Sequence, residues 1–205
     1  MHVSTGDVEV TGKVGELIAA GHPVFTIDAD GPDDLGRVFF LSEFATAVAG
    51  WALGINPFDQ PNVQEAKDNT KRVLEEGSPA LEDGDLDALL GGLEPPRYLA
   101  IMGYLPYEGA VESGAARFRE RVVRRHHVAT TFGYGPRFLH STGQFHKGGP
   151  AVGAFLQIVD EPEEDLEVPG EPYTFGTLIR AQADGDLQTL RSHGLDAVRA
   201  GREIL

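Results

Sequence analysis

Two segments of the chain concentrate residues of the kinds that bind or transform small molecules. The first is residues 54–67, with the sequence GINPFDQPNVQEAK. Asp59 and Gln60 stand between two prolines, and Lys67 follows Asn62 by about one and a half helical turns. Side chains of this kind often cap or brace a turn. On residue types alone, a braced turn followed by a surface lysine explains the segment as well as a binding site does.

The second segment is residues 133–150, GYGPRFLHSTGQFHKGGP, which follows a predicted strand. Glycines allow a close approach of the backbone, hydroxyl groups can donate to phosphate oxygens, and lysine supplies positive charge. The pattern is neither a Walker loop nor a dinucleotide-binding fingerprint, and a braced structural loop is the alternative. The candidate ligand contacts here are His140, Ser141, Thr142, Gln144, His146 and Lys147.

Composition excludes several other kinds of site. The chain has no cysteine, so it has neither disulfides nor thiolate metal ligands. His126 and His127 are adjacent, and adjacent rings cannot share one helix face as metal ligands, so we expect no metal. With 17 basic and 32 acidic residues the net charge is −15, which argues against nucleic-acid binding. No signal peptide or membrane span is evident, so we expect a cytoplasmic protein that does not bind membranes.

Short apolar runs alternate with segments of helical spacing, and this alternation predicts the elements that position both candidate segments. It is typical of an α/β fold with a doubly wound, mainly parallel sheet that has helices on both faces. Ligands of such sheets bind beyond the carboxyl ends of the strands. The predicted strands are residues 23–27, 98–102, 128–132, 154–159 and 196–199; the predicted helices are residues 11–20, 35–53, 63–75, 110–125, 173–183 and 187–192.

Two features concern how the chain is divided. The helix predicted over residues 35–53 has little polar surface, so we expect it to be largely buried. Residues 77–96 are rich in glycine, proline and polar residues and are the best candidate linker. We therefore expect residues 1–76 to form the first part of the α/β unit and residues 97–205 to complete its sheet. Residues 160–167 are strongly acidic and predict an exposed loop.

Residues 43–50 (EFATAVAG) and 54–63 (GINPFDQPNV) closely resemble a signature of the glucose-6-phosphate isomerases. The rest resembles the branch in which the isomerase is fused behind a transaldolase, where segments like 133–150 and 173–178 recur in the same order. The resemblance covers roughly residues 20–205. It implies that this chain is the second of two sugar-isomerase (SIS) domains, each a doubly wound α/β sheet, and that the protein forms a homodimer.

The resemblance also implies a reaction and roles for two residues. Family members interconvert glucose 6-phosphate and fructose 6-phosphate by opening the ring and moving a proton between C2 and C1 through an enediol. They need no metal or organic cofactor. Lys67 occupies the place of the family's lysine that assists at the sugar ring oxygen, and Gln60 the place of a sugar contact.

The chain departs from the family in what it lacks. The family's proton-transferring glutamate lies in a Glu-Ser-(Asn/Thr)-Gly-Lys segment, which does not occur here. The Ser/Thr-rich phosphate loop belongs to the first domain. We therefore expect an isomerase portion that is inactive until a first domain is supplied. A non-catalytic sugar-phosphate binding or regulatory module, and an assembly piece that only contributes to a dimer interface, are the alternatives.

Overall fold

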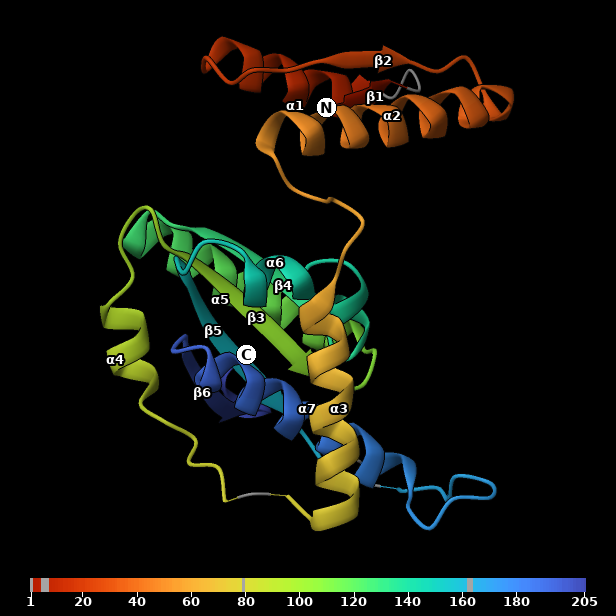
Figure 1. The fold of residues 1–205 in the computed structure, drawn as a ribbon. Helices are drawn as coiled ribbons and strands as arrows, with labels where there is room; N and C mark the ends of the chain where they lie inside the picture. Colours follow the sequence, from red (N-terminus) through yellow and green to blue (C-terminus); the bar gives the residue numbers. More distant parts are fainter. Residues whose placement is uncertain (1, 5–7, 79, 162–163) are drawn as a thin grey trace. The chain divides into compact units, whose positions relative to one another are not determined.

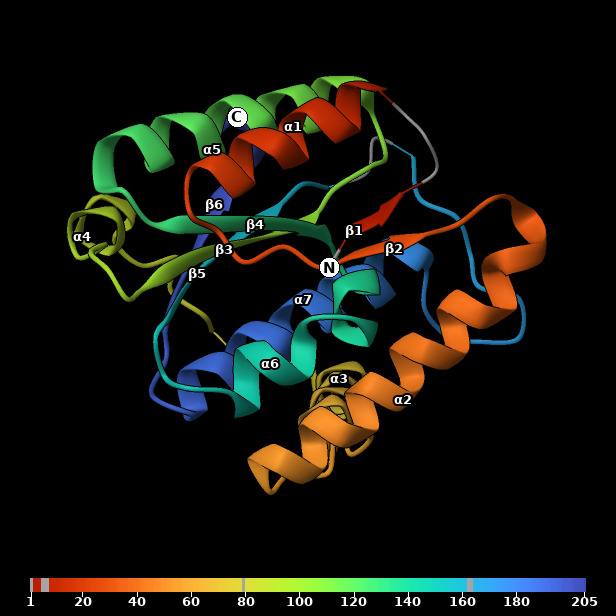
Figure 2. The ribbon, with the colours of Figure 1, turned by 90° about the horizontal axis from the view of Figure 1, so that it is seen from above.

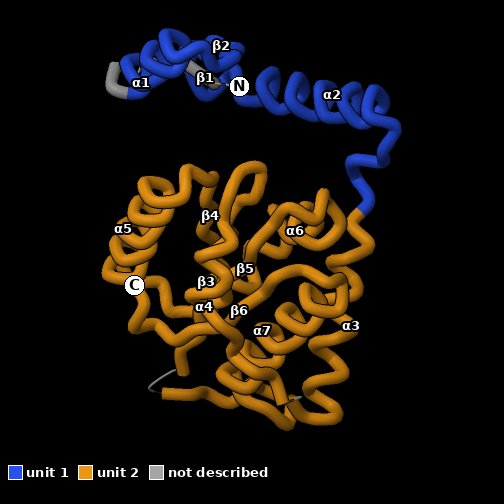
Figure 3. The backbone as a smooth tube through the Cα atoms, turned by 90° about the vertical axis from the view of Figure 1, so that its left-hand side faces the viewer, with its two compact units in different colours: residues 1–59 blue, residues 60–205 orange. Residues whose placement is uncertain are grey.

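The computed structural model describes residues 2–4, 8–78, 80–161 and 164–205, and it divides into two compact units, Met1–Asp59 and Gln60–Leu205 (Figure 3). The division falls before the predicted linker. Residues 77–96 lie inside the second unit because helix α3 (Pro61–Glu76), which precedes them, packs along helix α7 (Phe175–Ser192) of that unit. Position 79 of that linker, positions 162–163 of the acidic loop and positions 1 and 5–7 lie outside the described residues.

The second unit is built on a parallel sheet of four strands (Figure 1). Its strands are β3 (Tyr98–Tyr104), β4 (Ala129–Tyr134), β5 (Gly153–Val159) and β6 (Asp196–Gly201), in the order β4-β3-β5-β6. The two central strands are in register, and Tyr104 pairs with Val159 at their carboxyl ends. β3 is buried along its whole length, as expected for a strand covered on both faces.

Helices cover both faces of this sheet, which confirms the predicted doubly wound fold (Figure 2). On one face, Leu99 and Ile101 of β3 lie in a core with Phe118 of helix α5 (Gly109–His126) and Leu89 of α4 (Leu86–Gly91). Alternate strand residues face opposite sides of a sheet, so Ala100 and its neighbours form a second core on the other side. The helices on that side are α7 (Phe175–Ser192) and the short α6 (Gly143–Gly148), and α3 (Pro61–Glu76) packs on α7.

The predicted division into helices 173–183 and 187–192 is wrong, because α7 is one continuous helix. Asp184, Gly185 and Asp186, which separate the two predicted helices, are all buried inside the helix. Both carboxylates are in ion pairs, and Gly185 lies against the backbone of α3 at Asn69 and Thr70. Short 3-10 helices complete the chain at Pro32–Asp34, Arg137–His140 and Arg202–Ile204.

The first unit holds strands β1 (His2–Ser4) and β2 (Thr26–Asp28), which pair in parallel, and helices α1 (Val8–Ala19) and α2 (Leu35–Leu53). The bounds of α2 match the prediction, but the prediction that it is largely buried is wrong. Phe40 is 70% exposed and Trp51 83% exposed. Among residues 10–59 only Val38 and Gly50 are buried. None of the described helices has both the length and the apolarity that a membrane crossing requires.

Candidate functional site

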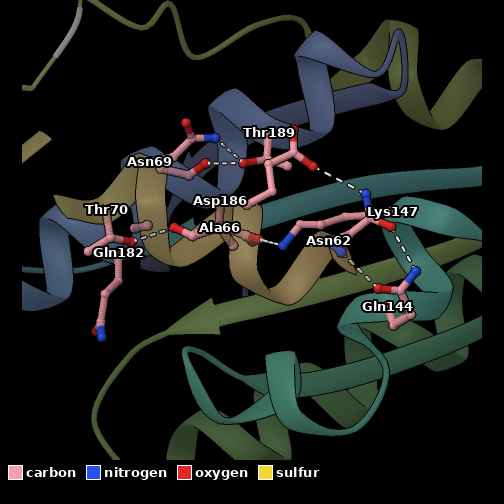
Figure 4. A network of polar contacts seen from close by, with 12 residues as sticks. Asn62, Ala66, Asn69, Thr70, Gln144, Lys147, Gln182, Asp186 and Thr189 are labelled. Atoms are coloured by element: carbon pink, nitrogen blue, oxygen red, sulfur yellow. Dashed lines mark hydrogen bonds and ion pairs between the residues drawn. The ribbon is translucent and has the colours of Figure 1, made fainter. Parts of the chain in front are cut away.

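The two segments singled out by the sequence meet at the start of α3. Gln60 is the N-cap residue of this helix, but its exposed side chain makes no capping bond. Gln144 of α6 supplies the cap instead: its Oε1 accepts from the Asn62 backbone amide at 3.0 Å, and its Nε2 donates to Asn62 Oδ1 at 2.7 Å (Figure 4). The first amides of a helix have no acceptor within the helix, so this pair fixes where α3 begins.

A chain of hydrogen bonds extends from this cap to α7. Asn62 Nδ2 donates to Glu65 Oε2 at 3.2 Å, and Glu65 Oε1 lies 3.0 Å from Nε2 of His193. Nδ1 of His193 lies 3.2 Å from the backbone oxygen of Lys147, which returns the chain to α6. We call the residues Gln144, Asn62, Glu65 and His193 the α3 bracket. Both ring nitrogens of His193 face acceptors, so both bonds form together only when the ring carries two protons.

The side chain of Lys147 points into the interior of the protein. Its ammonium forms an ion pair with Asp186 of α7, and both side chains are only 1% exposed (Figure 4). Burial raises the pKa of Asp186, and the positive charge of Lys147 opposes that rise. Tyr104, at the end of β3, is also buried next to Asp186, and burial raises its pKa well above its ordinary value. Lys147 therefore presents no charge at the surface in this structure.

His146 lies in the second core rather than at the surface. Its Nδ1 is 2.9 Å from the hydroxyl of Tyr98, and its ring packs against Phe155. Burial, and then the charge of Lys147, lowers the pKa of His146 to about 4, so the ring is neutral at about pH 7. Burial also raises the pKa of Tyr98 to about 12. This pair is a neutral hydrogen bond inside the core.

A second buried charge cluster lies beside the first and was missed by sequence reasoning. Arg199 of β6 forms an ion pair with Asp184 at 2.7 Å and donates from Nε to Gln157 Oε1 at 2.8 Å. Gln157 in turn donates to the backbone oxygen of Ala183 at 2.8 Å. The signal in the sequence was a single polar residue inside an apolar strand, namely Gln157 in FLQIV and Arg199 in AVRAG. Polar residues at such positions need buried partners.

The remaining predicted site residues stay at the surface. Lys67 is exposed on α3 and makes no hydrogen bond or ion pair with any described residue. His140 and Ser141 are exposed, and the Ser141 hydroxyl donates to the backbone oxygen of Phe138 at 3.1 Å. Thr142 is partly buried at the start of α6 and makes no capping bond. The fold thus joins Gln144, His146 and Lys147 to α3 and the sheet, and it leaves Lys67 available to a ligand.

A cavity of about 440 Å³ lies at the carboxyl ends of β3 and β5. Tyr104 and Val159 line it from the strands, Val73 and Leu74 from α3, and Thr177 from the first turn of α7. None of the predicted site residues lines it. Among the described residues, no group of three or more His, Asp or Glu could hold a metal ion.

Comparison with known proteins gives a partial similarity to glucose-6-phosphate isomerases. The enzyme of Leptospira biflexa serovar Patoc is 38% identical over 73 residues, 33% of this chain and 16% of that protein. The enzyme of Exiguobacterium sibiricum is 41% identical over 59 residues, 29% of this chain and 13% of that protein. For the enzyme of Heliobacterium modesticaldum the identity is 46% over 48 residues, 23% of this chain and 10% of that protein. The matched part thus spans less than a fifth of each relative.

Two other comparisons add little about function. No protein-family model matches the chain. The crystal structure of a hypothetical protein from Thermus thermophilus aligns with a TM-score of 0.48 and 16% identity, over 91% of this chain and 48% of that one.

Proposed function

We propose that this chain is the C-terminal portion of a glucose-6-phosphate isomerase and turns over only together with a first isomerase domain. The observation that carries the proposal is the identity of 38–46% with isomerases of several bacteria over part of the chain. We also propose SIS-type architecture for the sheet unit, a cytoplasmic location and assembly as a homodimer. A transaldolase fused ahead of the isomerase belongs to the same proposal.

Lys67 is the residue through which this chain would act on the sugar. An ammonium near the ring oxygen stabilises the charge that develops while the ring opens and the proton moves between C2 and C1. The exposed Lys67 side chain has no partner among the described residues, so no existing ion pair has to break before it meets a sugar phosphate. The α3 bracket holds the start of this helix in place, and Gln60 precedes it as the proposed sugar contact.

The other parts of the reaction have to come from elsewhere. His146 and Lys147 are buried and engaged with Tyr98 and Asp186, so neither is placed to act as a base or to bind phosphate. The cavity at the sheet edge is lined by three carboxylates and by Arg180, and such a lining repels a phosphate. A first isomerase domain would supply both the general base and the phosphate loop.

A coupled assay that measures formation of glucose 6-phosphate from fructose 6-phosphate tests the proposal. We expect no turnover by this chain alone and turnover when it is mixed with the first-domain half of a bacterial glucose-6-phosphate isomerase. In the mixture, Lys67→Ala should lower kcat by about a hundredfold. Lys71→Ala, one turn further along α3, is the matched control, because among the described residues Lys71 pairs only with Glu75 at the surface; it should change kcat by less than about twofold. Equal activity of the Lys67→Ala mixture and the unmodified mixture would remove Lys67 from the mechanism.

Binding measurements distinguish the proposed isomerase portion from the alternative, a sugar-phosphate binding module. If fructose 6-phosphate binds to this chain alone, and no first-domain half restores turnover, the chain is a sugar-phosphate binding module rather than half of an enzyme.

A further inference from the structure

The cavity at the carboxyl ends of β3 and β5 lies where the chain connections of the doubly wound fold pass from one face of the sheet to the other. The chain leaves β3 through α5 on one face of the sheet and leaves β5 through α7 on the other face. β3 and β5 are neighbours, so their carboxyl ends form the switch point at which ligands of open α/β sheets bind. Tyr104 and Val159, the last residue pair of the two strands, both line the cavity.

The lining has an apolar side and an acidic side. Val73 and Leu74 of α3 and Ile179 and Ala183 of α7 form the apolar side. Among the described residues, the acidic side comes from the loop after β5 and consists of Asp160, Glu161 and Asp165, and Arg180 is the cation of the lining. A volume of about 440 Å³ is within the range of small-molecule sites.

The three carboxylates differ in how far their charge is already satisfied. Hydrogen bonds from the Thr174 hydroxyl and the Gly176 amide, the latter at 2.7 Å, lower the pKa of Asp165 and keep it ionised. Asp160 accepts from the Glu161 backbone amide at 3.0 Å and has a longer contact of 3.4 Å with Arg202. The Glu161 carboxylate forms no hydrogen bond or ion pair with any described residue. Among the described residues of the lining, Glu161 is therefore the carboxylate without a hydrogen-bond or ion-pair partner, and Arg180 already pairs with Asp184 at 3.6 Å.

The described groups around the cavity do not favour an anion. Asp165 and Thr174 already accept from the first amides of α7, at Gly176 and Thr177, so this helix end offers no free donors to an anion. In the described part of the chain, the carboxylates do not converge as a metal-binding group of three. At the cavity floor, Tyr104 is 2% exposed, and its hydroxyl contacts Asp186 and lies 3.5 Å from the backbone oxygen of Gln182.

We propose that this cavity binds a small organic cation with an apolar stem, of the alkyldiamine class. The methylene stem packs against Val73, Leu74 and Ile179, and one ammonium meets Glu161 and Asp160 at the mouth. A neighbouring hollow shares Asp160, Glu161 and Arg180 and adds Glu203 and Arg202, and Glu203 is the acidic group that it offers to the second ammonium. Binding is a property of this chain alone and does not depend on isomerase activity.

A series of five-carbon probes that differ in charge tests the proposal by calorimetry and by amide chemical shifts. We expect 1,5-diaminopentane to bind, 1,5-pentanediol to bind at least about tenfold more weakly, and glutarate not to bind. The shifts should centre on Gly77, Ser78 and Thr177, which line the cavity. Equal binding of the diol or the dianion would overturn the charge assignment.

Two pairs of variants separate this site from general attraction to an acidic protein. Glu161→Gln should weaken diamine binding by about fivefold, whereas Glu171→Gln, an equal charge change outside the cavity lining, should not. Ser78→Trp should block the cavity from an exposed position, while the control Ser113→Trp on α5 should leave binding intact. Equal effects within either pair, or shifts spread over the acidic surface, would show that the cavity is not the site.

Discussion

At the scale of single residues, Gln144 is the side chain that joins the two segments selected from the sequence. It satisfies an amide at the start of α3 and also bonds the Asn62 side chain. We expect Gln144→Ala to lower the free energy of unfolding by about 1–2 kcal/mol, because a helix-capping bond and a second hydrogen bond are lost. Gln64→Ala is the control, since Gln64 bonds only Asp68 at the surface and should cost less than about 0.5 kcal/mol. Urea unfolding measures both; equal costs would mean that Gln144 does not cap α3.

The buried pair of Lys147 and Asp186 gives a second prediction at this scale. Lys147→Met leaves the Asp186 carboxylate without its cation and should destabilise the protein by about 3–5 kcal/mol. The double change Lys147→Met with Asp186→Leu should recover most of that loss, because no buried charge remains. Chemical denaturation of the two variants checks this. If the double variant is no more stable than the single one, apolar packing rather than charge explains the loss.

The stability cost of Lys147→Met should depend on pH. Burial raises the pKa of Asp186 above its ordinary value of 3.8, and Lys147 opposes the rise, so removing Lys147 should raise this pKa further. A group with a raised pKa in the folded state stabilises the fold when it is protonated, and this contribution is lost as the pH rises through the folded-state pKa. Lys147→Met should therefore cost less at about pH 5 than at about pH 7. A stability cost of Lys147→Met that is the same at both pH values would contradict this prediction.

The contribution of His146 to stability should change with pH in the opposite direction. Its folded-state pKa of about 4 lies below the unfolded value of 6.5, so its contribution to stability is present above about pH 6.5 and is lost as the pH falls toward 4. The loss should approach about 3 kcal/mol. In His146→Gln this contribution is absent, so unfolding free energies of variant and parent should converge between about pH 7 and pH 4.5. Parallel curves over that range would show that the buried ring does not titrate in this way.

At the scale of elements, the close approach of α3 to α7 depends on Gly185. A β-carbon at this position would lie 2.9 Å from the backbone nitrogen of Thr70, so Gly185→Ala must move one helix backbone. We expect a loss of about 1–3 kcal/mol and faster hydrogen exchange of α3 amides. Gly91→Ala is the control, because nothing lies within 4 Å of the added carbon. An unchanged stability of Gly185→Ala would show that the two helices can separate without cost.

The elements also show what a sequence can and cannot predict. The strands around Leu99 and Phe155 were predictable because buried parallel strands are continuous apolar runs. The bond between Gln144 and Asn62 was not, because it joins residues 82 positions apart and depends on how α6 lies against α3. The segments of both residues were identified separately from their composition. Their contact is a tertiary feature with no local pattern.

At the scale of the whole molecule, the two units differ in whether they have a core of their own. The sheet unit has a core on each face of its sheet, whereas residues 10–59 bury only Val38 and Gly50. The apolar composition of α2 predicted a buried helix, but burial depends on what covers the helix. We propose that the first isomerase domain covers α2.

Trp51 reports on this proposal directly, because it is the only tryptophan in the chain and is 83% exposed. In the chain alone we expect the emission of a solvated indole and rapid hydrogen exchange of α2 amides, with slow exchange in β3 and β5. When the first-domain half of an isomerase is added, the emission should shift to shorter wavelength and the α2 amides should become protected. Trp51→Phe is the control that assigns the emission, and Phe40→Asp should weaken the assembly by placing a charge on the covered surface. If turnover appears in the mixture while Trp51 stays solvated, α2 is not the surface on which the two halves meet. If the Trp51 emission shifts when this chain alone is concentrated, a second copy of the chain covers α2 instead.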